Sequence, residues 1–330
     1  MTPRERYEAM LTGQSCDIVP RTPILMRLAA EQINAEYIEF TRNYKVMVEA
    51  QIFCAEKFGI DQLSVISGSY GETQGYGGEI GYRPLGPYVS RLPLGATTDL
   101  GTLRNPDPFT TPLLIDRLNA IREYRRLTGE KYSVCGWIEG PAAQSADMRG
   151  IEQFLMDLIE EPEFCADCMD LVTDKAIIFA KAQHEAGADT IGVGDAIASQ
   201  VSLRTYKKLI FPREKRLFDA IKALGCYTKL HICGNITHLL PAIAELDVDI
   251  IDVDHMVDIN KVRDILGSRV AITGNIDPVL VMTANPEYIA KTMRDTYAAI
   301  AAPFLLNAGC EIPPGTPDVN LLALCQRIDA

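Results

Sequence analysis

The sequence is poor in histidine and has no surplus of positive charge. Its 330 residues include four histidines and carry a formal net charge of −12. A surface that binds nucleic acid needs clustered lysine and arginine, so this balance argues against nucleic acid and against docking on an anionic membrane. No apolar run reaches the roughly 18 to 20 residues that span a bilayer, and residues 1–14 lack the apolar core of a signal peptide.

A disulfide framework is also lacking. The nine cysteines are an odd number and are spread along the chain without the spacing of paired half-cystines. This pattern is typical of a reducing cytoplasm, where thiols serve as metal ligands or as small buried side chains. Apolar residues make up 47% of the chain and charged residues 23%, which indicates a globular protein with a large core. We therefore expect a cytoplasmic protein.

Short β-rich runs alternate with longer amphipathic segments along the whole chain. Most of the short runs are continuously apolar and end in a polar residue, which is typical of parallel strands buried on both faces. They lie at residues 22–27, 62–67, 132–139, 189–195, 227–233, 248–254, 270–277 and 304–310. The clearest helical segments lie at residues 44–58, 150–187, 201–224, 236–246 and 285–302. Eight such units in one series predict an α/β fold, a (β/α)8 TIM barrel, as a single domain over residues 1–330.

One segment, residues 68–95, interrupts the alternation and is rich in glycine, tyrosine and proline. It does not match a phosphate-binding loop, because the GxGxxG spacing is not met and no Lys-Ser/Thr pair follows. A long insertion after the second barrel strand predicts a lid or hairpin over the active-site face. Its tyrosines either pack the lid or line a pocket for a flat substrate; they are Tyr70, Tyr76, Tyr82 and Tyr88.

Polar residues stand where the predicted strands end. In a barrel enzyme the catalytic groups lie at the carboxyl ends of the strands and in the loops that follow. Read in order, these positions hold Arg27, Glu72, Glu139, Asp195, His231 with Cys233, Asp254, Asn275 and Cys310. The acids are candidate catalytic residues, namely Glu72, Glu139, Asp195 and Asp254. The candidate substrate-binding residues are Arg27, Tyr70, Tyr76 and Asn275.

Three of these positions carry soft or borderline metal ligands. His231 and Cys233 are two residues apart on a strand, so both side chains point to the same side. Cys310 ends the last strand and reaches the same mouth of the barrel. Such a set fits catalytic zinc, which keeps three protein ligands and one exchangeable position. The alternative is that the thiols and the imidazole are buried core residues. The other close pair, Cys165 and Cys168, is predicted to lie on an acidic helix, without a second CxxC motif.

Several longer motifs follow one another in a recognisable order. They are "PRTPILMR", "GDAIASQVSLRTYKKLIFP", "KLHICGN", "VDIIDVDHMVD", "ITGNIDP" and "FLLNAGCEIPPGTPDVNLLAL". In order and spacing the chain resembles the uroporphyrinogen decarboxylase-like superfamily, a set of (β/α)8 barrels. The resemblance runs over nearly the whole chain, so it implies the same barrel.

Two departures identify the branch of the superfamily that the chain resembles. Decarboxylases follow the first strand with an arginine-rich segment that grips a tetrapyrrole; here "MRLAAEQINAEYIEF" keeps only Arg27. They also carry Gly-His-Gly after the last strand, where this chain has Gly309, Cys310 and Glu311. The His-x-Cys motif with a late cysteine is similar to the zinc signature of the cobalamin-dependent methyltransferases. The resemblance implies zinc on the residues His231, Cys233 and Cys310.

The same resemblance suggests an acid as the fourth zinc ligand. The strand-end acid of related zinc methyltransferases matches Asp254, and Glu139 and Glu72 are rivals for this role.

Zinc bound to a methyl ether oxygen would stabilise the negative charge that develops as the methyl group leaves. The methyl group would pass to the Co(I) corrinoid of a separate carrier protein, because the chain lacks the DxHxxG motif of cobalamin-binding domains.

The identity of the small molecule rests on the lid. The stretch "VISGSYGETQGYGGEI" resembles the same segment of methyltransferases that demethylate aromatic methyl ethers. We therefore expect a methoxylated aromatic methyl donor. The alternative is a thiol of the coenzyme M type that takes the methyl group from methylcobalamin, and a uroporphyrinogen-type decarboxylase is the least favoured reading. The oligomeric state is left open, with a homodimer as one option.

Overall fold

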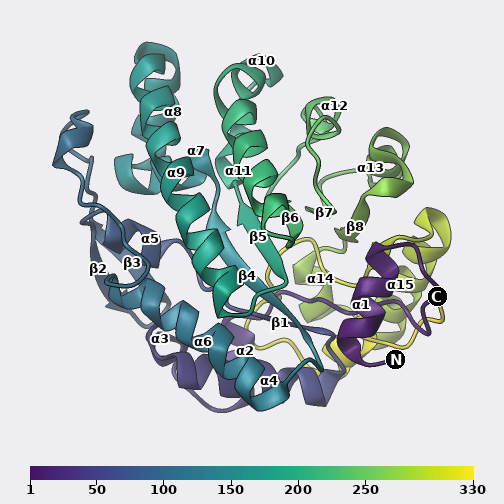
Figure 1. Cartoon of the computed structure of the whole chain (residues 1–330). Coiled ribbons are helices and arrows are strands. Elements are labelled where there is room, and N and C mark those ends of the chain that lie inside the picture. Colours follow the sequence, from purple (N-terminus) through teal and green to yellow (C-terminus); the bar gives the residue numbers. More distant parts are fainter.

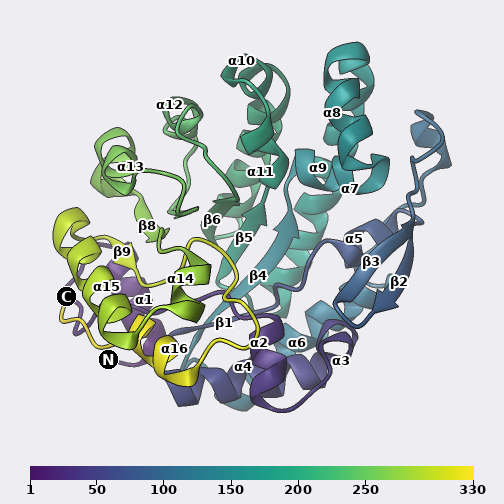
Figure 2. The ribbon, with the colours of Figure 1, turned by 180° about the vertical axis from the view of Figure 1, so that it is seen from behind.

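The structure is a computed structural model that describes all 330 residues. Seven parallel strands form one curled sheet in the order β1-β4-β5-β6-β7-β8-β9, and helices pack around its outer face (Figure 1 and Figure 2). The barrel strands are β1 (Gln62–Ser64), β4 (Ser133–Glu139), β5 (Thr190–Gly194), β6 (Tyr227–Ile232), β7 (Ile250–Val253), β8 (Ala271–Gly274) and β9 (Phe304–Leu305). The predicted (β/α)8 barrel is confirmed.

The barrel closes through a short extended segment in place of a full eighth strand. Arg21 forms a parallel bridge with Leu306, the residue after β9. Thr22 N donates a hydrogen bond to Leu306 O, and Asp61 N donates to Arg21 O, each at 2.8 Å. The segment around Arg21 therefore joins the last strand to the first.

The predicted strand over residues 22–27 is wrong. Only residue 21 takes part in the sheet, and Arg27 already begins helix α2 (Arg27–Gln32). Pro20 and Pro23 flank the bridge, and neither has the backbone N–H that a longer ladder would need. The other seven predicted strands exist but are shorter. Most of their polar carboxyl ends belong to loops, whereas Glu139 is the last residue of β4.

The observed bounds of the helices agree with the predicted segments to different degrees. Segment 44–58 matches α4 (Tyr44–Phe58), whose first turn is capped by the Asn43 side chain and which ends at Gly59 in the left-handed conformation. Segment 150–187 is two helices, α8 (Ile151–Glu160) and α9 (Pro162–Ala186). The break falls at Pro162, which lacks the N–H to continue the first helix.

Two other helical segments differ from their expected form. Segment 201–224 contains α10 (Leu203–Thr205), a π-helical turn (Tyr206–Ile210) and α11 (Phe211–Ala223), while segment 236–246 holds only one turn, α12 (Leu240–Ile243). Segment 285–302 becomes α15 (Pro286–Ile300). The remaining helices are α1 (Pro3–Leu11), α3 (Tyr37–Arg42), α5 (Tyr70–Gly75), α6 (Pro112–Thr128), α7 (Pro141–Arg149), α13 (Ile259–Leu266), α14 (Pro278–Thr283) and α16 (Asp318–Leu324).

The insertion after β1 is a helix followed by an antiparallel hairpin. Helix α5 leads into β2 (Glu79–Arg83) and β3 (Gly86–Arg91), which pair with each other and not with the barrel. The Tyr88 ring lies against Gly81, where a Cβ atom would come within 2.6 Å of the ring. The Arg83 guanidinium of β2 stacks on the Tyr88 ring of β3, 3.8 Å from the centre of the ring. The expected hairpin is therefore present.

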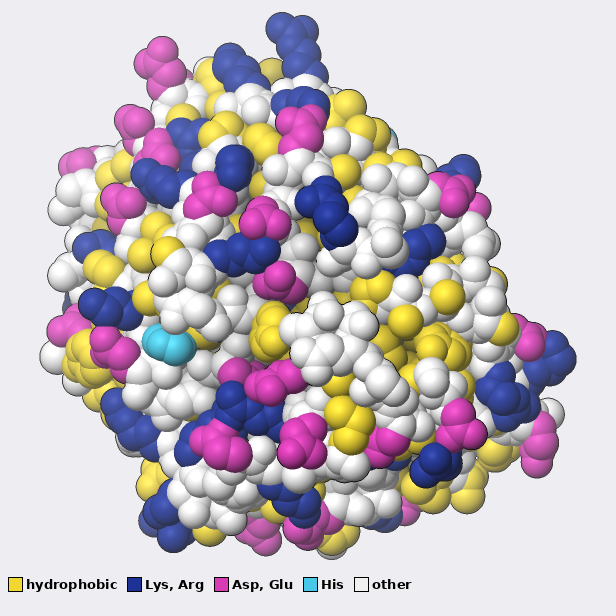
Figure 3. Space-filling view, turned by 45° about the vertical axis from the view of Figure 1, so that its right-hand side comes forward, with side chains coloured by type: hydrophobic (Ala, Val, Ile, Leu, Met, Phe, Trp, Pro, Cys, Tyr) yellow, Lys and Arg dark blue, Asp and Glu magenta, His cyan; other side chains and the backbone are white.

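A continuous apolar core joins all parts of the barrel. One cluster of 84 buried hydrophobic residues draws members from every barrel strand and from helices at both ends of the chain. No helix is both long and apolar enough to cross a membrane. On the face drawn in Figure 3, acidic and basic side chains are interspersed, and apolar side chains gather towards its right-hand half.

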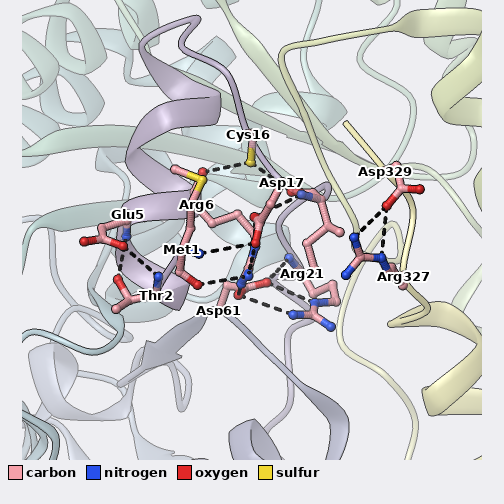
Figure 4. Close-up of polar contacts among 11 residues, drawn as sticks. Met1, Thr2, Glu5, Arg6, Cys16, Asp17, Arg21, Asp61, Arg327 and Asp329 are labelled. Carbon is pink, nitrogen blue, oxygen red and sulfur yellow. Dashed lines mark hydrogen bonds and ion pairs between the residues drawn. The ribbon is translucent and has the colours of Figure 1, made fainter.

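A buried ion network fixes the closing segment to the first strand (Figure 4). The Asp61 carboxylate, fully buried before β1, accepts hydrogen bonds from Arg21 N at 2.8 Å and Arg21 Nε at 3.0 Å. Its other oxygen accepts from the buried Arg6 guanidinium of α1. The hydrogen-bonded Asp17 carboxylate raises the pKa of Arg6, so Arg6 stays charged.

Replacing Asp61 should lower the free energy of unfolding more than replacing a member of an exposed ion pair does. We predict that Asp61→Ala lowers the free energy of unfolding by about 3–5 kcal/mol, because it leaves the Arg6 charge buried without this partner. The matched control is Asp329→Ala, which removes an exposed pair with Arg327 and should have little effect. Denaturant titration measures both, and equal losses in the two variants would contradict the assigned role of Asp61.

Candidate metal centre

Two strand ends bring three ligand side chains together at the mouth of the barrel. His231 lies on β6, Cys233 directly follows it, and Cys310 lies in the loop after β9. His231 Nε2 is 3.1 Å from Cys233 Sγ, the two sulfurs are 3.6 Å apart, and Cys310 Sγ is 3.8 Å from His231 Nε2. We call these three residues the His–Cys–Cys cluster; it is the group of potential metal ligands whose donor atoms lie within 4.8 Å of one another.

The shape of the cluster fits a tetrahedral zinc ion. With zinc at about 2.3 Å from sulfur and about 2.0–2.1 Å from nitrogen, tetrahedral angles place two sulfurs about 3.8 Å apart and sulfur about 3.6 Å from nitrogen. The sulfur–sulfur distance of 3.6 Å and the sulfur–nitrogen distances of 3.1 and 3.8 Å are close to these values. Three protein ligands of this kind leave one position for an exchangeable group, as in catalytic zinc sites.

A glycine lets Cys310 reach the other two ligands. Gly309 packs directly on the chain that follows β7, and a Cβ atom at this position would lie 2.6 Å from His255 N and 3.2 Å from Asp254 Cα. Both contacts are with backbone atoms, which cannot move aside as a flexible side chain can. The loop after β9 therefore crosses the end of β7 only because residue 309 has no side chain.

A buried carboxylate lies behind the imidazole of the cluster. Asp252 stands opposite His231 in the parallel register of β6 and β7, and its Oδ2 is 3.6 Å from His231 Nδ1. The same carboxylate pairs with the buried Lys229 Nζ at 2.7 Å and accepts from Asn307 Nδ2 at 3.2 Å. An acid on the far side of a ligating histidine fixes the ring and raises its basicity. Asp252 was not among the predicted site residues.

The charges of the site favour an anionic thiol group next to the imidazole. Burial opposes the charged form of His231, but the Asp252 carboxylate outweighs it and raises the pKa of His231 to about 10. The two cysteines share one proton, since a hydrogen bond between them lowers the pKa of Cys310 to about 4 and raises the pKa of Cys233. A thiolate is the form of cysteine that binds metal.

The acid proposed as a fourth ligand has other partners in the structure. Asp254 Oδ2 accepts a hydrogen bond from Gly234 N at 2.9 Å, and Oδ1 accepts from Met256 N at 3.0 Å. The Asn275 side chain donates to Asp254 O at 3.0 Å and to Val257 O at 2.7 Å. Asp254 and Asn275 therefore order the loops that follow β6 and β7, and the Asp254 carboxylate is not part of the His–Cys–Cys cluster.

Two glycines on β5 make room for an indole ring beside the cluster. Trp137 of β4 stands opposite Gly192, and Glu139 stands opposite Gly194, which pairs in turn with His231. A Cβ atom would lie 2.4 Å from the indole ring at Gly192 and 2.9 Å from it at Gly194. The ring thus lies across β5, with its centre 6.3 Å from the centre of the His231 ring.

Three acids with raised pKa values lie near one another and near the indole. Glu139 accepts from Trp137 Nε1 at 3.1 Å, and its backbone N–H donates to Glu72 Oε1 at 3.0 Å. Burial raises the pKa of Glu72 to about 8 and that of Asp147 to about 6. It raises the pKa of Glu139 well above its usual value, and the charges of Asp147 and Glu72 add to this effect. At neutral pH Glu72 and Glu139 are thus protonated.

Asp195, another of the predicted catalytic acids, supports helix α7. Asp195, directly after β5 and fully buried, accepts from Ala143 N at 2.7 Å in the first turn of α7. Burial raises the pKa of Asp195 to about 7, although the backbone hydrogen bonds oppose the shift. The buried Glu214 of α11 lies beside it and has a raised pKa for the same reason. The pair ties β5 to α7 and α11.

The predicted substrate-binding residues are placed in different environments. Tyr70 lines a pocket together with Trp137, and burial raises its pKa, with further contributions from the acids nearby. Tyr76 packs instead in a small separate cluster of buried apolar residues. The Arg27 side chain lies 3.7 Å from Glu31, while its backbone N–H donates to Glu311, the residue after Cys310.

The thiols of the CxxC pair on α9 have raised pKa values, unlike Cys310 of the cluster. Cys165 and Cys168 are buried on α9, and burial raises their pKa values to about 12 and about 11. These values disfavour the thiolate. The chain's other pair of neighbouring cysteine and histidine, Cys226 and His184, lies 3.2 Å apart, and burial again raises the pKa of its thiol to about 12.

Comparison with known proteins identifies the family to which the chain belongs. The chain matches the family described as "Uroporphyrinogen decarboxylase (URO-D)" over residues 2–330 and belongs to that family. It is 26% identical to the methylcobamide:CoM methyltransferase MtaA of Methanosarcina barkeri, over 99% of this chain and 98% of the relative. It is 32% identical to the methylcobamide:CoM methyltransferase MtbA of Methanosarcina acetivorans, over 64% of this chain and 63% of the relative.

A solved structure agrees with the fold. A methyltransferase from Methanosarcina mazei superposes with a TM-score of 0.86 at 23% sequence identity, covering 98% of this chain and 97% of that one. The curated relatives confirm the expectation that the chain lies in the cobalamin-dependent methyltransferase branch of the family.

Adding a single methyl group at Gly309 should displace a ligand. We predict that Gly309→Ala lowers zinc affinity by about 10-fold or more, because the new Cβ collides with the backbone of residues 254–255 and moves Cys310. The control is Gly101→Ala, where the nearest atom is the end of the flexible Asp99 side chain at 3.0 Å. Competition with a chelator measures both affinities, and unchanged binding in Gly309→Ala would contradict the proposed crossing of the loops.

The raised pKa of Glu72 predicts a particular dependence of stability on pH. Stability that comes from neutral Glu72 is fully present below its unfolded pKa of 4.5 and is lost as the pH rises towards its folded pKa of about 8. Glu72→Gln cannot ionise, so the variant should gain stability relative to the wild type between pH 5 and pH 8. Denaturant titrations across this range test the expectation, and parallel curves for the two proteins would refute it.

Proposed function

We propose that the chain is a zinc-dependent enzyme that moves a methyl group from a methoxylated aromatic compound to the Co(I) corrinoid of a separate carrier protein. The observation that carries the proposal is the His–Cys–Cys cluster, whose three donor atoms lie within 4.8 Å at the barrel mouth. Membership of the methyltransferase branch makes the chain a corrinoid-dependent methyltransferase.

The cluster would hold the metal in an open site. His231, Cys233 and Cys310 supply one nitrogen and two sulfurs, and Asp252 would hold the His231 ring in place. Zinc held there would supply a Lewis acid for the oxygen that loses its methyl group. Asp254 is the candidate for the fourth position, which it would have to yield to the substrate. To reach the metal, its carboxylate would have to give up its hydrogen bonds with the backbone of residues 234 and 256.

The remaining residues favour a flat, uncharged reacting group. Trp137 and Tyr70 line the same pocket and offer ring faces for stacking. Glu72 and Glu139 lie beside the indole, and burial keeps both protonated at neutral pH. A protonated carboxyl group can donate a hydrogen bond and can return a proton to a departing phenoxide. Asp195 contributes through the position of α7.

A thiol acceptor is the second candidate, and the relatives favour it. The similar proteins from two Methanosarcina species are described as methylcobamide:CoM methyltransferases. In that reaction the same cluster would hold the sulfur of a thiol, and the methyl group would move from the corrinoid to the thiol. The cluster supports transfer in either direction, so the two candidates differ in the small molecule.

A methyl-transfer assay decides between them. We predict that the zinc-loaded protein and a Co(I) corrinoid protein convert a methoxyarene to a phenol with formation of methyl-Co(III), followed by ultraviolet–visible spectroscopy. Cys310→Ala should lose both zinc and activity while remaining folded, since zinc in an open site serves catalysis more than folding. Cys168→Ala, in the buried pair of α9, is the control and should keep both.

The other results of the assay are equally informative. Consumption of methyl-Co(III) by thiols alone would reject the aromatic donor and establish the second candidate. Full zinc content in Cys310→Ala would remove that residue from the ligand set. Release of carbon dioxide from uroporphyrinogen at a comparable rate would contradict the assignment to methyl transfer.

A further inference from the structure

Beneath the His–Cys–Cys cluster, donors from two segments of the barrel converge on one carboxylate oxygen. Asp252 Oδ2 lies 2.7 Å from Lys229 Nζ, accepts a hydrogen bond from Asn307 Nδ2 at 3.2 Å and faces His231 Nδ1 at 3.6 Å. Asp252 and Asn307 are fully buried, and Lys229 is 3% exposed. Because solvent does not reach these groups, protein partners alone set the orientation of the carboxylate.

The His231 ring presents its two nitrogens to different partners. Nε2 faces the sulfurs of Cys233 and Cys310, at 3.1 and 3.8 Å. Nδ1 is buried, forms no hydrogen bond and faces Asp252. A neutral imidazole carries one proton, so a ring that binds metal through Nε2 has its N–H at Nδ1. A buried N–H without an acceptor is costly, so metal binding through Nε2 needs an acceptor where Asp252 lies.

Asn307 is held in the one orientation that can donate to this carboxylate. Its Oδ1 accepts hydrogen bonds from Ala308 N at 2.8 Å and from Ile24 N at 3.2 Å. An ionised carboxylate cannot donate, so the amide nitrogen has to point towards Asp252. Asn307 follows β9 and precedes Cys310 by three residues. The segment that carries one potential metal ligand therefore also orients the acid behind another.

Two further residues confine the carboxylate. Lys229 lies two residues before His231 on β6, so both side chains point to the same side of the sheet. Its ammonium group balances the charge of Asp252, as a buried carboxylate requires. A Cβ atom at Gly274 of β8 would lie 2.9 Å from Asp252 Oδ1 and 2.5 Å from Val253 O. The close packing of β8 against the carboxylate therefore needs glycine at this position.

We infer that Asn307 is a positioning residue of the metal centre, which acts through Asp252. By holding Oδ2 opposite His231 Nδ1, it selects the ring tautomer with the proton on Nδ1 and directs Nε2 to the zinc ion. A hydrogen bond of about 2.9 Å needs the ring and the carboxylate to approach by about 0.7 Å from their distance of 3.6 Å. This inference rests on the proposed function, because it assigns a role beneath the zinc site that the proposed reaction uses.

NMR of protein with isotope-labelled histidine tests the tautomer in the wild type. The chain has four histidines, and the signals that are missing from His231→Ala belong to His231. We expect the zinc-loaded protein to show a metal-bound Nε2 and a protonated Nδ1, with a slowly exchanging proton that the carboxylate shifts downfield. Zinc on Nδ1, or an Nδ1 proton that exchanges too fast to be observed, would overturn the inference, whatever the folding of the variants.

Substitution then assigns the effect to Asn307. We expect Asn307→Leu to lower zinc affinity about 10-fold or more, the loss typical of groups that support a metal ligand, and to move the Nδ1 proton signal of His231. Chelator competition measures the affinity. Asn320→Leu is the matched control, because Asn320 is also buried and donates to the carbonyls of Val281 and Ala284. It should lose stability but keep both the zinc affinity and the signal.

A double-mutant cycle separates action through Asp252 from a shift of the chain that carries Cys310. The background Lys229→Met/Asp252→Leu removes the carboxylate and its counter-charge together, so the net charge is unchanged. In that background Asn307→Leu should cost much less zinc affinity than in the wild type, because the group it acts through is gone. Equal losses in the two backgrounds would overturn the inference.

These measurements are independent of methyl transfer. A protein that binds zinc through Nε2, with the dependence on Asn307 described above, but transfers no methyl group would leave the inference standing and reject the proposed function. Unchanged zinc affinity and an unmoved Nδ1 signal in folded Asn307→Leu would overturn the inference and leave the proposed function intact.

Discussion

The whole site depends on the curvature of one parallel sheet. Strands β6 and β9 are separated by two others, so on a flat sheet their ends would be about 14 Å apart, three spacings of about 4.8 Å. In the closed barrel the thiols that follow them are 3.6 Å apart. The buried Asp61 carboxylate holds the closing segment at Arg21 and the helix that carries Arg6, so an ion network on the opposite end of the strands supports the geometry of the cluster.

At the mouth of the barrel, glycines without side chains allow neighbouring segments and rings to approach closely. Gly309 allows the last loop to cross the end of β7, and Gly192 and Gly194 allow Trp137 to lie across β5 beside His231. Beneath the cluster, the Asp252 carboxylate pairs with Lys229 and faces His231 Nδ1 at 3.6 Å. The result is a closely packed set of three potential ligands at the mouth of the barrel.

Much of this site could be predicted from the sequence, because parallel strands place their carboxyl ends on one face. His231, Cys233 and Cys310 stand at strand ends and share the chemistry of zinc ligands. Lys229 and Asp252 were missed because they lie inside β6 and β7, two residues before the strand-end residues His231 and Asp254. A polar residue within an apolar run is hard to assign to a site.

The failures in the fold also have physical causes. The strand expected over residues 22–27 is absent because Pro20 and Pro23 cannot donate to a ladder. The long helix expected over residues 150–187 is broken by Pro162. Asp254 and Asn275 stand at strand ends as expected, but their side chains satisfy backbone groups of neighbouring loops, which no pattern in a single sequence reveals.

The central claim is that the His–Cys–Cys cluster binds zinc as one site. X-ray absorption at the zinc edge of the purified protein tests it most directly. The account predicts about one zinc per chain, with two sulfur scatterers at about 2.3 Å and the remaining ligands, nitrogen or oxygen, at about 2.0–2.2 Å. A zinc shell made only of nitrogen and oxygen, or a folded protein that binds no zinc, would contradict it.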